Sequence, residues 1–239
     1  MVSIAYLVPG DGLADEELSR REGIANELVR ADVSVIAADR GPKSIESEVE
    51  HEWSVEGSLR LIREHGDDFD AFVIGCFGDP GVTAARELTD TPVVGPAAST
   101  FHTASQISDR FTCLTVRDTP ASKRRQIRAT HLDSQLASVR VVETSVEEIN
   151  TEEVGLVDQM IDASRLAIEE DGAESVIPGC MSLSFMRAHQ DVQSAISIPV
   201  LDPASISLET AEMWARHDIQ PSRLSYPKFD DSQYETLFD

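Results

Sequence analysis

Two segments of the chain repeat the same local pattern, and this repetition constrains the fold more than any other feature. In each copy an apolar run ends in Gly-Cys, a stretch of helical character follows, and the copy closes on Pro-Val-x-x-Pro-Ala. The two cysteines are Cys76 and Cys180, and the closing strings are residues 92–97 and 199–204. The repetition predicts an internally duplicated molecule in which each half contributes one thiol.

Apolar segments rich in Val and Ile alternate with longer amphipathic segments along nearly the whole chain. This alternation is typical of a parallel sheet flanked by helices, and it predicts an α/β fold. Strands are expected at residues 2–8, 33–38, 71–75, 92–94, 111–116, 139–142, 175–179 and 199–201. They group into two pseudo-symmetric domains, each a mainly parallel four-stranded sheet flanked by helices.

The predicted boundaries follow from this grouping. The first half takes residues 1–97 plus 204–220 and holds Cys76, and the second half takes residues 98–203 and holds Cys180. In the last helix the stripe expected to pack in the core is Ile206, Thr210, Met213, Trp214 and His217. Residues 221–239 form an acidic C-terminal tail with several aromatic residues, for which docking on the same subunit, docking on a partner and disorder all stay open.

The chain is strongly acidic, with 43 Asp and Glu against 20 Lys and Arg and a formal net charge of -23. The acidic residues are scattered through a chain that is 41% apolar, so we interpret the charge as adaptation to a salt-rich cytoplasm; an ordinary acidic protein is the alternative. Nucleic acid is excluded as a partner because no basic footprint is visible. No apolar run reaches membrane-spanning length and the N-terminus does not resemble a signal peptide, so we expect a soluble, cytoplasmic protein without a membrane partner.

The cysteine pattern indicates free thiols instead of disulfides or a zinc site. There are three cysteines, an odd number, and no Cys or His pair has zinc-ligand spacing. Cys113 lies inside an apolar strand, where we expect a buried structural role. None of the lysines has the context of a pyridoxal phosphate site, so an enzyme that uses this cofactor is not expected.

The segment around Cys76 favours anion binding beside a reactive sulfur. Glycines at 75, 78 and 81 permit tight turns, and Pro80 suits the first turn of a helix, so Cys76 is expected at or just before a helix N-terminus. Unpaired N–H groups there favour a thiolate and a developing enolate oxygen. Cys180 has a similar context, with Ser182 or Ser184 as capping candidates.

These motifs resemble those of the hydantoin racemase branch of the aspartate/glutamate/hydantoin racemase superfamily. The resemblance rests on Asp70-Ala-Phe-Val-Ile-Gly-Cys-Phe-Gly-Asp-Pro-Gly81, on Gly41-Pro-Lys-Ser-Ile-Glu-Ser47, on Arg110-Phe-Thr-Cys-Leu-Thr115, on Ile177-Pro-Gly-Cys-Met181 and on Pro199-Val-Leu-Asp-Pro203. It extends over about residues 1–217, and the string beginning at Cys76 is fairly specific.

The resemblance implies a cofactor-independent racemase or epimerase with its active site in the cleft between the two domains. One cysteine removes a proton from a carbon next to a carbonyl, and the other returns one to the opposite face. It makes Cys76 and Cys180 the acid/base pair. Backbone groups around the cysteines would bind the substrate oxygens, at Phe77, Gly78, Met181 and Ser182.

The loop after the first strand departs from the family pattern. These racemases usually have Asn-Pro-Asn-Thr there, whereas this chain has Val8-Pro9-Gly10-Asp11. Pro9 and Asp11 are therefore counted among the candidate substrate-binding residues. An ionised Asp11 would repel an anionic substrate but not a neutral ring, which favours a hydantoin or related ureide over an acidic amino acid.

Other functions stay open. The chain could be an amino-acid racemase, a decarboxylase or cis-trans isomerase of the same superfamily that uses one cysteine differently, or a non-catalytic binder of small ligands. In every case the expected partner is a small molecule, and a homo-oligomer is expected.

Overall fold

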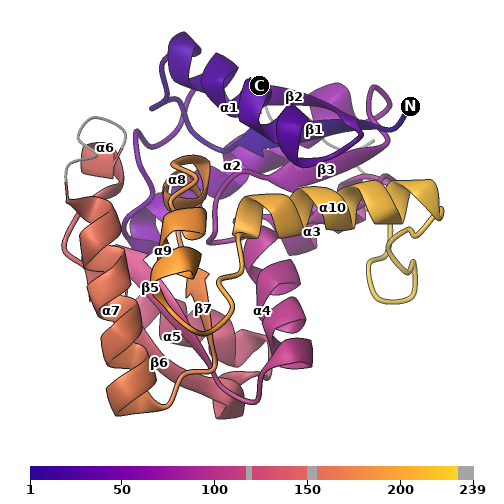
Figure 1. Ribbon diagram of the computed structural model, residues 1–239. Coiled ribbons are helices and arrows are strands. Elements are labelled where there is room, and N and C mark those ends of the chain that lie inside the picture. Colours follow the sequence, from indigo (N-terminus) through magenta and orange to yellow (C-terminus); the bar gives the residue numbers. More distant parts are fainter. Residues whose placement is uncertain (117–119, 150–154, 231–239) are drawn as a thin grey trace. The chain divides into compact units, whose positions relative to one another are not determined.

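The structure, a computed structural model, describes residues 1–116, 120–149 and 155–230 (Figure 1). Their contacts divide into two compact units, each with its own sheet. The first unit holds residues 1–43, 49–95 and those from Leu208 on, and the second holds residues 44–48 and 96–207.

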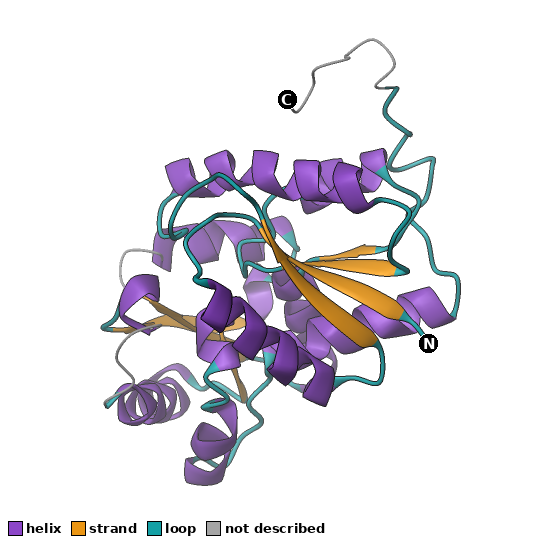
Figure 2. Cartoon of the chain, turned by 90° about the horizontal axis from the view of Figure 1, so that it is seen from above, coloured by secondary structure: helices purple, strands orange, loops and turns teal. Residues whose placement is uncertain are grey.

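The first sheet is parallel and has the strand order β2-β1-β3-β4. Its strands are β1 (Ser3–Val8), β2 (Asp32–Ala37), β3 (Ala71–Ile74) and β4 (Val93–Val94). Every residue of β3 is buried, as expected for a strand with other structure on both faces (Figure 2). All four strands lie where the apolar runs predict them.

The second sheet is also parallel, but it has three strands instead of the predicted four. The order is β6-β5-β7, with β5 (Phe111–Val116), β6 (Leu136–Val142) and β7 (Ser175–Pro178). The predicted strand at 199–201 is reduced to a single bridge between Val200 and Val176. The physical reason is Pro178, because the next ladder bond would need the N–H that proline lacks.

The strand order β6-β5-β7 matches β2-β1-β3, and the two sheets also share equivalent backbone hydrogen bonds. Gly75 N donates to Leu7 O at 2.6 Å in the first sheet, and Gly179 N donates to Leu114 O at 2.7 Å in the second. In the same way, Phe72 N donates to Pro92 O, and Val176 N donates to Pro199 O. The sequence repeat therefore corresponds to a repeat of strand pairing.

Helices connect the strands of both sheets. They are α1 (Asp15–Leu28), α2 (Glu48–His65), α3 (Val82–Leu88), α4 (Pro96–Ile107), α5 (Pro120–Ala129), η1 (Asp133–Gln135), α6 (Val146–Ile149), α7 (Leu156–Asp171), α8 (Met181–Phe185), α9 (His189–Ala195) and α10 (Pro203–Arg216). Local sequence explains several ends: α1 opens with three acidic residues that complement its dipole, and α7 ends at Gly172 in the left-handed conformation.

Each unit has an apolar core on its sheet. In the first, Leu7, Phe72 and Ile74 meet Ile62 of α2. In the second, the residues that meet are Leu114, Val142, Met160, Val176 and Leu183.

The predicted core stripe of α10 is wrong. The residues buried along this helix are Pro203, Ala204, Ser207, Leu208 and Ala211. Met213 is 45% exposed and His217 is exposed. Two sides of this helix are apolar in sequence, one through Leu208 and one through Met213. The side through Leu208, which carries the small residues, is the one that is buried.

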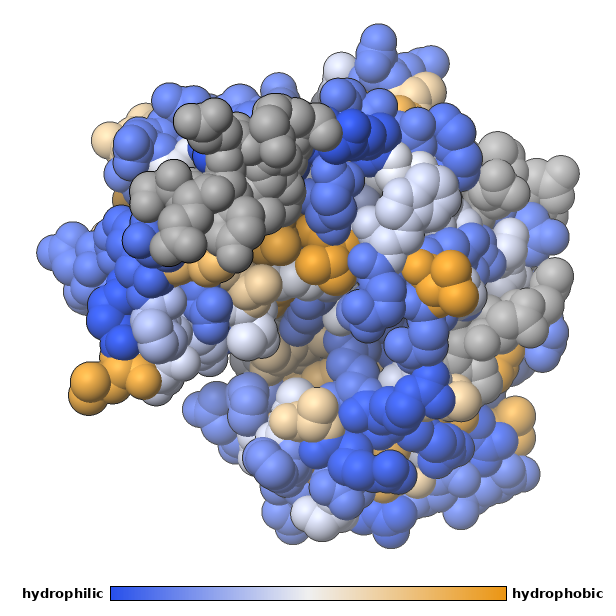
Figure 3. Space-filling view, turned by 180° about the vertical axis from the view of Figure 1, so that it is seen from behind, coloured by the Kyte–Doolittle hydropathy of each residue, from blue (hydrophilic) through white to orange (hydrophobic). Residues whose placement is uncertain are grey.

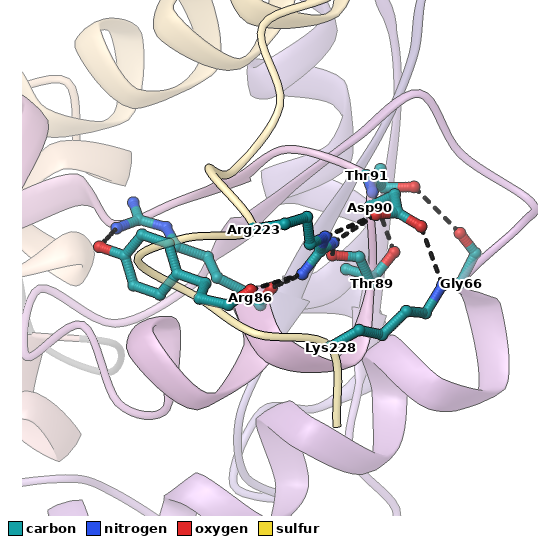
Figure 4. A network of polar contacts seen from close by, with 8 residues as sticks. Gly66, Arg86, Thr89, Asp90, Thr91, Arg223 and Lys228 are labelled. Atoms are coloured by element: carbon teal, nitrogen blue, oxygen red, sulfur yellow. Dashed lines mark hydrogen bonds and ion pairs between the residues drawn. The ribbon is translucent and has the colours of Figure 1, made fainter. Parts of the chain in front are cut away.

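The described part of the C-terminal tail, up to residue 230, contacts the end of α3 and the loop that follows it (Figure 4). Arg223 donates to the carbonyl oxygens of Arg86 and Thr89 at the end of α3, at 2.8 and 2.6 Å. Arg223 and Lys228 both bind the carboxylate of Asp90, each at 2.8 Å. This part of the tail therefore docks on its own subunit; residues 231–239 lie outside the described residues.

The surface reflects the polar composition. Figure 3 shows one face, where hydrophilic residues predominate and apolar residues form small separate groups. Within the described ranges, no helix is both long and apolar enough to cross a membrane.

Candidate active site

Cys76 lies in a turn that follows β3. Its carbonyl accepts a hydrogen bond from Asp79 N at 3.0 Å, and its Sγ accepts one from Gly78 N at 3.3 Å. The cysteine is partly buried, whereas the Phe77 side chain is only 2% exposed. The Phe77 side chain is therefore part of the core, and only the Phe77 backbone is positioned to bind a ligand.

The predicted helix N-terminus at Cys76 is wrong. Helix α3 begins only at Val82, after Asp79 and Gly81 adopt positive φ angles of 54° and 78°. These left-handed residues insert a turn between the cysteine and the helix. The local donor to the sulfur is therefore the N–H of Gly78 and not a helix end.

The loop after β1 reaches the same edge of the first sheet. Leu7 of β1 pairs with Ile74 of β3, so Pro9 and Asp11 follow at the carboxyl edge where Cys76 also lies. Pro9 is buried, and its carbonyl oxygen lies against α2, 3.2 Å from the place where a Cβ on Gly57 would stand.

Asp11 is paired with a lysine that sequence reasoning did not connect to it. Lys43 Nζ lies 3.0 Å from Asp11 Oδ2, and the lysine side chain is 71% exposed. The two loops can approach this closely because residues 10 and 12 are glycines. A side chain at either position would collide with the backbone of Pro42 or Lys43. The lysine partly offsets the negative charge of Asp11, so the expected repulsion of an anionic substrate is weaker than the sequence indicates.

Cys180 lies at the N-cap position of α8, as predicted for a cysteine before a helix. Its carbonyl accepts a hydrogen bond from Ser184 N at 3.2 Å, and the cysteine is partly buried. Met181 and Ser182 form the first turn of α8 and are 3% and 5% exposed. Ser182 and Ser184 lie inside the helix, so neither is the cap that the sequence predicted.

Cys113 has the structural role that its sequence context predicts. It is fully buried in β5, and this burial raises the pKa of its thiol to about 12. The positive charge of Lys123 lowers the same pKa by a smaller amount. Cys180 makes a smaller electrostatic contribution to the rise in this pKa. A thiol with such a pKa stays protonated near neutral pH.

The structure thus groups the predicted site residues by unit. Pro9, Asp11, Cys76, Phe77 and Gly78 lie in the first, at the edge where β1 and β3 end. Cys180, Met181 and Ser182 lie in the second, after β7.

Sequence reasoning missed one residue beside Cys76. His51 of α2 lies with Nε2 3.0 Å from Gly78 O. No periodic signal separates this histidine from the others in the chain, because its contact depends on how α2 packs against the turn.

Comparison with known proteins identifies the family of the chain. The family model of Asp/Glu/hydantoin racemases matches residues 22–211. The chain is 32% identical over 209 residues to a hydantoin racemase of Paenarthrobacter aurescens, covering 84% of this chain and 86% of that protein. It is 29% identical over 195 residues to a hydantoin racemase of Pseudomonas sp. (strain NS671), covering 80% and 78%.

Solved structures show the same fold. An allantoin racemase from Klebsiella pneumoniae superposes with a TM-score of 0.86 at 24% identity, covering 96% of this chain and 95% of that chain. Since the family model spans most of the sequence and the duplicated cysteine motifs fall within it, this chain belongs to the Asp/Glu/hydantoin racemase family and is an isomerase of that family.

Proposed function

We propose that the protein racemises a hydantoin or a related ureide without a cofactor, with Cys76 and Cys180 as the acid/base pair. The observation that carries this proposal is the equivalent placement of the two thiols. Each follows a glycine whose N–H donates to the neighbouring strand, at Leu7 in one sheet and Leu114 in the other. Both thiols are partly exposed, whereas the third cysteine of the chain is buried.

The chemistry requires two bases and a stabilised enolate. A hydrogen on a carbon next to a carbonyl is acidic enough to remove only when the developing oxygen charge is bound. One sulfur, as thiolate, takes this proton, and the other, as thiol, gives a proton to the opposite face. The configuration is inverted and the two thiols exchange protonation states, so no other reactant is consumed.

Backbone N–H groups beside the thiols are the proposed oxygen ligands. In the second unit these are the N–H groups of Met181 and Ser182, which lie in the first turn of α8 directly after Cys180. In the first unit the proposed ligand is the Phe77 N–H, at the edge where β3 ends, because the Gly78 N–H already donates to Cys76 Sγ.

A ureide substrate is favoured by two lines of support. The curated relatives described above are hydantoin racemases, and the structural neighbour is an allantoin racemase, both named for cyclic ureides. The Asp11–Lys43 pair at the edge near Cys76 is close to neutral as a unit, which suits an uncharged ring with polar groups.

Polarimetry tests the proposal. Single enantiomers of 5-substituted hydantoins, allantoin, aspartate and glutamate are incubated with the protein, and loss of optical rotation is expected for a ureide. Cys76→Ser and Cys180→Ser should each reduce this rate by about 10³-fold or more, because a hydroxyl is a far weaker base than a thiolate. Cys113→Ser is the matched control and should retain activity, since that thiol is buried in a strand.

The other outcomes identify the alternatives. Racemisation of aspartate or glutamate alone would indicate an amino-acid racemase. Full activity in one of the two cysteine variants would overturn the two-base scheme and favour a single-cysteine decarboxylase or isomerase. Saturable binding of a ureide with unchanged rotation would indicate a binding protein.

A further inference from the structure

The ring of His51 is fixed against the turn that carries Cys76. His51 belongs to α2, and its Nε2 lies 3.0 Å from the carbonyl oxygen of Gly78. A carbonyl oxygen only accepts, so Nε2 carries the proton and donates it. Both residues lie in the first unit, and the His51 side chain is only 26% exposed.

Gly78 lies between the imidazole and the sulfur. Its N–H donates to Cys76 Sγ at 3.3 Å while its carbonyl accepts from His51. A Cβ at this position would stand 2.8 Å from His51 Cδ2 and 3.4 Å from Cys76 Sγ. One residue without a side chain therefore connects the ring to the thiol. Its N–H and its carbonyl belong to adjacent peptide units that meet at Gly78 Cα, so holding the carbonyl restrains the position from which the N–H reaches the sulfur.

Helix α2 gives His51 a firm support. Its buried residues include Ser54, Gly57 and Ile62, and Ser54 Oγ donates to the His51 carbonyl at 2.7 Å. The helix meets the Cys76 turn at a second point, where Gly81 stands close to Ser58 and Val55. A side chain on such a helix positions a neighbouring loop more accurately than a loop residue can.

We infer that His51 is a positioning residue for Cys76, and this inference rests on the proposed function. By holding the Gly78 carbonyl, His51 restrains Gly78 and so keeps its N–H within reach of Sγ. A thiolate accepts a hydrogen bond more strongly than a thiol does, so this bond favours the basic form of Cys76 and fixes the direction of its sulfur. The role requires only the N–H donor at Nε2.

Two readouts on the full chain test the inference. The first is the rate at which iodoacetamide alkylates Cys76 in the native protein at neutral pH, measured by mass spectrometry with Cys180 in the same sample as reference. The second is the separation of kcat from KM for the racemised ureide. His51→Leu removes the donor, whereas His51→Gln keeps an amide N–H at a similar reach, and His51→Asn keeps an amide that is too short.

His51→Leu and His51→Asn should lower kcat and the Cys76 alkylation rate by about 10-fold, with KM and Cys180 alkylation nearly unchanged. His51→Gln should recover most of both. Unchanged Cys76 reactivity in His51→Leu, an equal change at both cysteines, or failure of His51→Gln to recover would overturn the inference. Activity retained in Cys76→Ser would instead overturn the proposed function, and the alkylation rates would still decide whether His51 controls Cys76.

Discussion

At the scale of single residues, the three cysteines differ because their surroundings differ. Cys76 and Cys180 follow strands at a sheet edge and are partly exposed, whereas Cys113 is enclosed within β5. Burial raises the pKa of Cys113 to about 12, while an exposed thiol ionises near 9.0. The chain therefore holds a built-in reference thiol that takes no part in proton transfer near neutral pH.

This difference predicts how stability depends on alkaline pH. Above pH 9 the unfolded chain releases the Cys113 proton and the folded chain keeps it, so stability should fall by up to about 1.4 kcal/mol per pH unit until about pH 12. Cys113→Ala should cost roughly 1 to 2 kcal/mol at pH 7 but show a flatter decline above pH 9. Urea unfolding from pH 7 to pH 11 measures both slopes, and parallel curves would contradict the prediction.

Sequence patterns could identify Cys76 and Cys180 because a cysteine after an apolar run at a predicted strand end is a local signal. They could not identify His51 or the pairing of Lys43 with Asp11, because both depend on which loops meet when α2 and the β1 loop pack. The sequence patterns also misplaced the start of α3. Pro80 suits the first turn of a helix, but Gly81 has a positive φ and the helix begins only after it.

At the scale of elements, the C-terminal tail binds the C-terminal end of α3. Arg223 binds the carbonyl oxygens of Arg86 and Thr89, which end the helix that follows the Cys76 turn. The Arg86 guanidinium in turn lies 5.3 Å from the centre of the Tyr226 ring and donates to its hydroxyl at 3.2 Å. Further along the tail, Phe229 N donates to Glu87 O at 2.9 Å.

Loss of Arg223 should therefore release the tail. In Arg223→Met, amide hydrogen exchange at Phe229 should accelerate by about 10-fold, because the contacts that order this segment are removed. Arg165→Met is the matched control, since Arg165 is 54% exposed and its pair with Asp162 is 3.7 Å long. Equal exchange in the wild type and Arg223→Met would show that the tail is held by other contacts.

The docking should also weaken in acid. Hydrogen bonds from Lys228 and then Arg223 lower the pKa of Asp90 below 3.8, so its contribution is present above that pH and is lost as the pH falls through the lowered value. Pepsin cleavage of the tail should accelerate over this range in the wild type, whereas Asp90→Asn should be cleaved quickly throughout. A wild-type cleavage rate that matches Asp90→Asn already at pH 4 would contradict this account.

Strand positions could be predicted well because buried parallel strands have continuous apolar runs. The fourth strand of the second sheet could not, since its loss depends on Pro178 in the neighbouring strand. The buried face of α10 could not be chosen either, because the stripes through Leu208 and through Met213 are both apolar in sequence.

At the scale of the whole molecule, the order β6-β5-β7 of the second sheet matches β2-β1-β3 of the first, and equivalent backbone bonds occur in both sheets. We propose that the halves 1–97 plus 204–220 and 98–203 are pseudo-symmetric domains derived from one repeated unit. This accounts for one thiol at an equivalent place in each sheet.

The net charge of -23 makes stability dependent on salt. Like charges on a folded surface repel one another over about 30 Å at 0.01 M salt but only about 3 Å at 1 M. The midpoint of thermal unfolding should therefore rise as KCl increases from 0.01 to 1 M, followed by far-UV circular dichroism. Sucrose is the uncharged control, and full stability in dilute buffer would remove the interpretation as a salt-adapted protein.

The most direct test of the central claim is solvent deuterium exchange at the stereocentre of each enantiomer of the racemised ureide, followed by NMR in D₂O. If Cys76 and Cys180 each serve one face, Cys76→Ser and Cys180→Ser should lose exchange from opposite enantiomers. Equal exchange of both enantiomers in either variant would contradict the account.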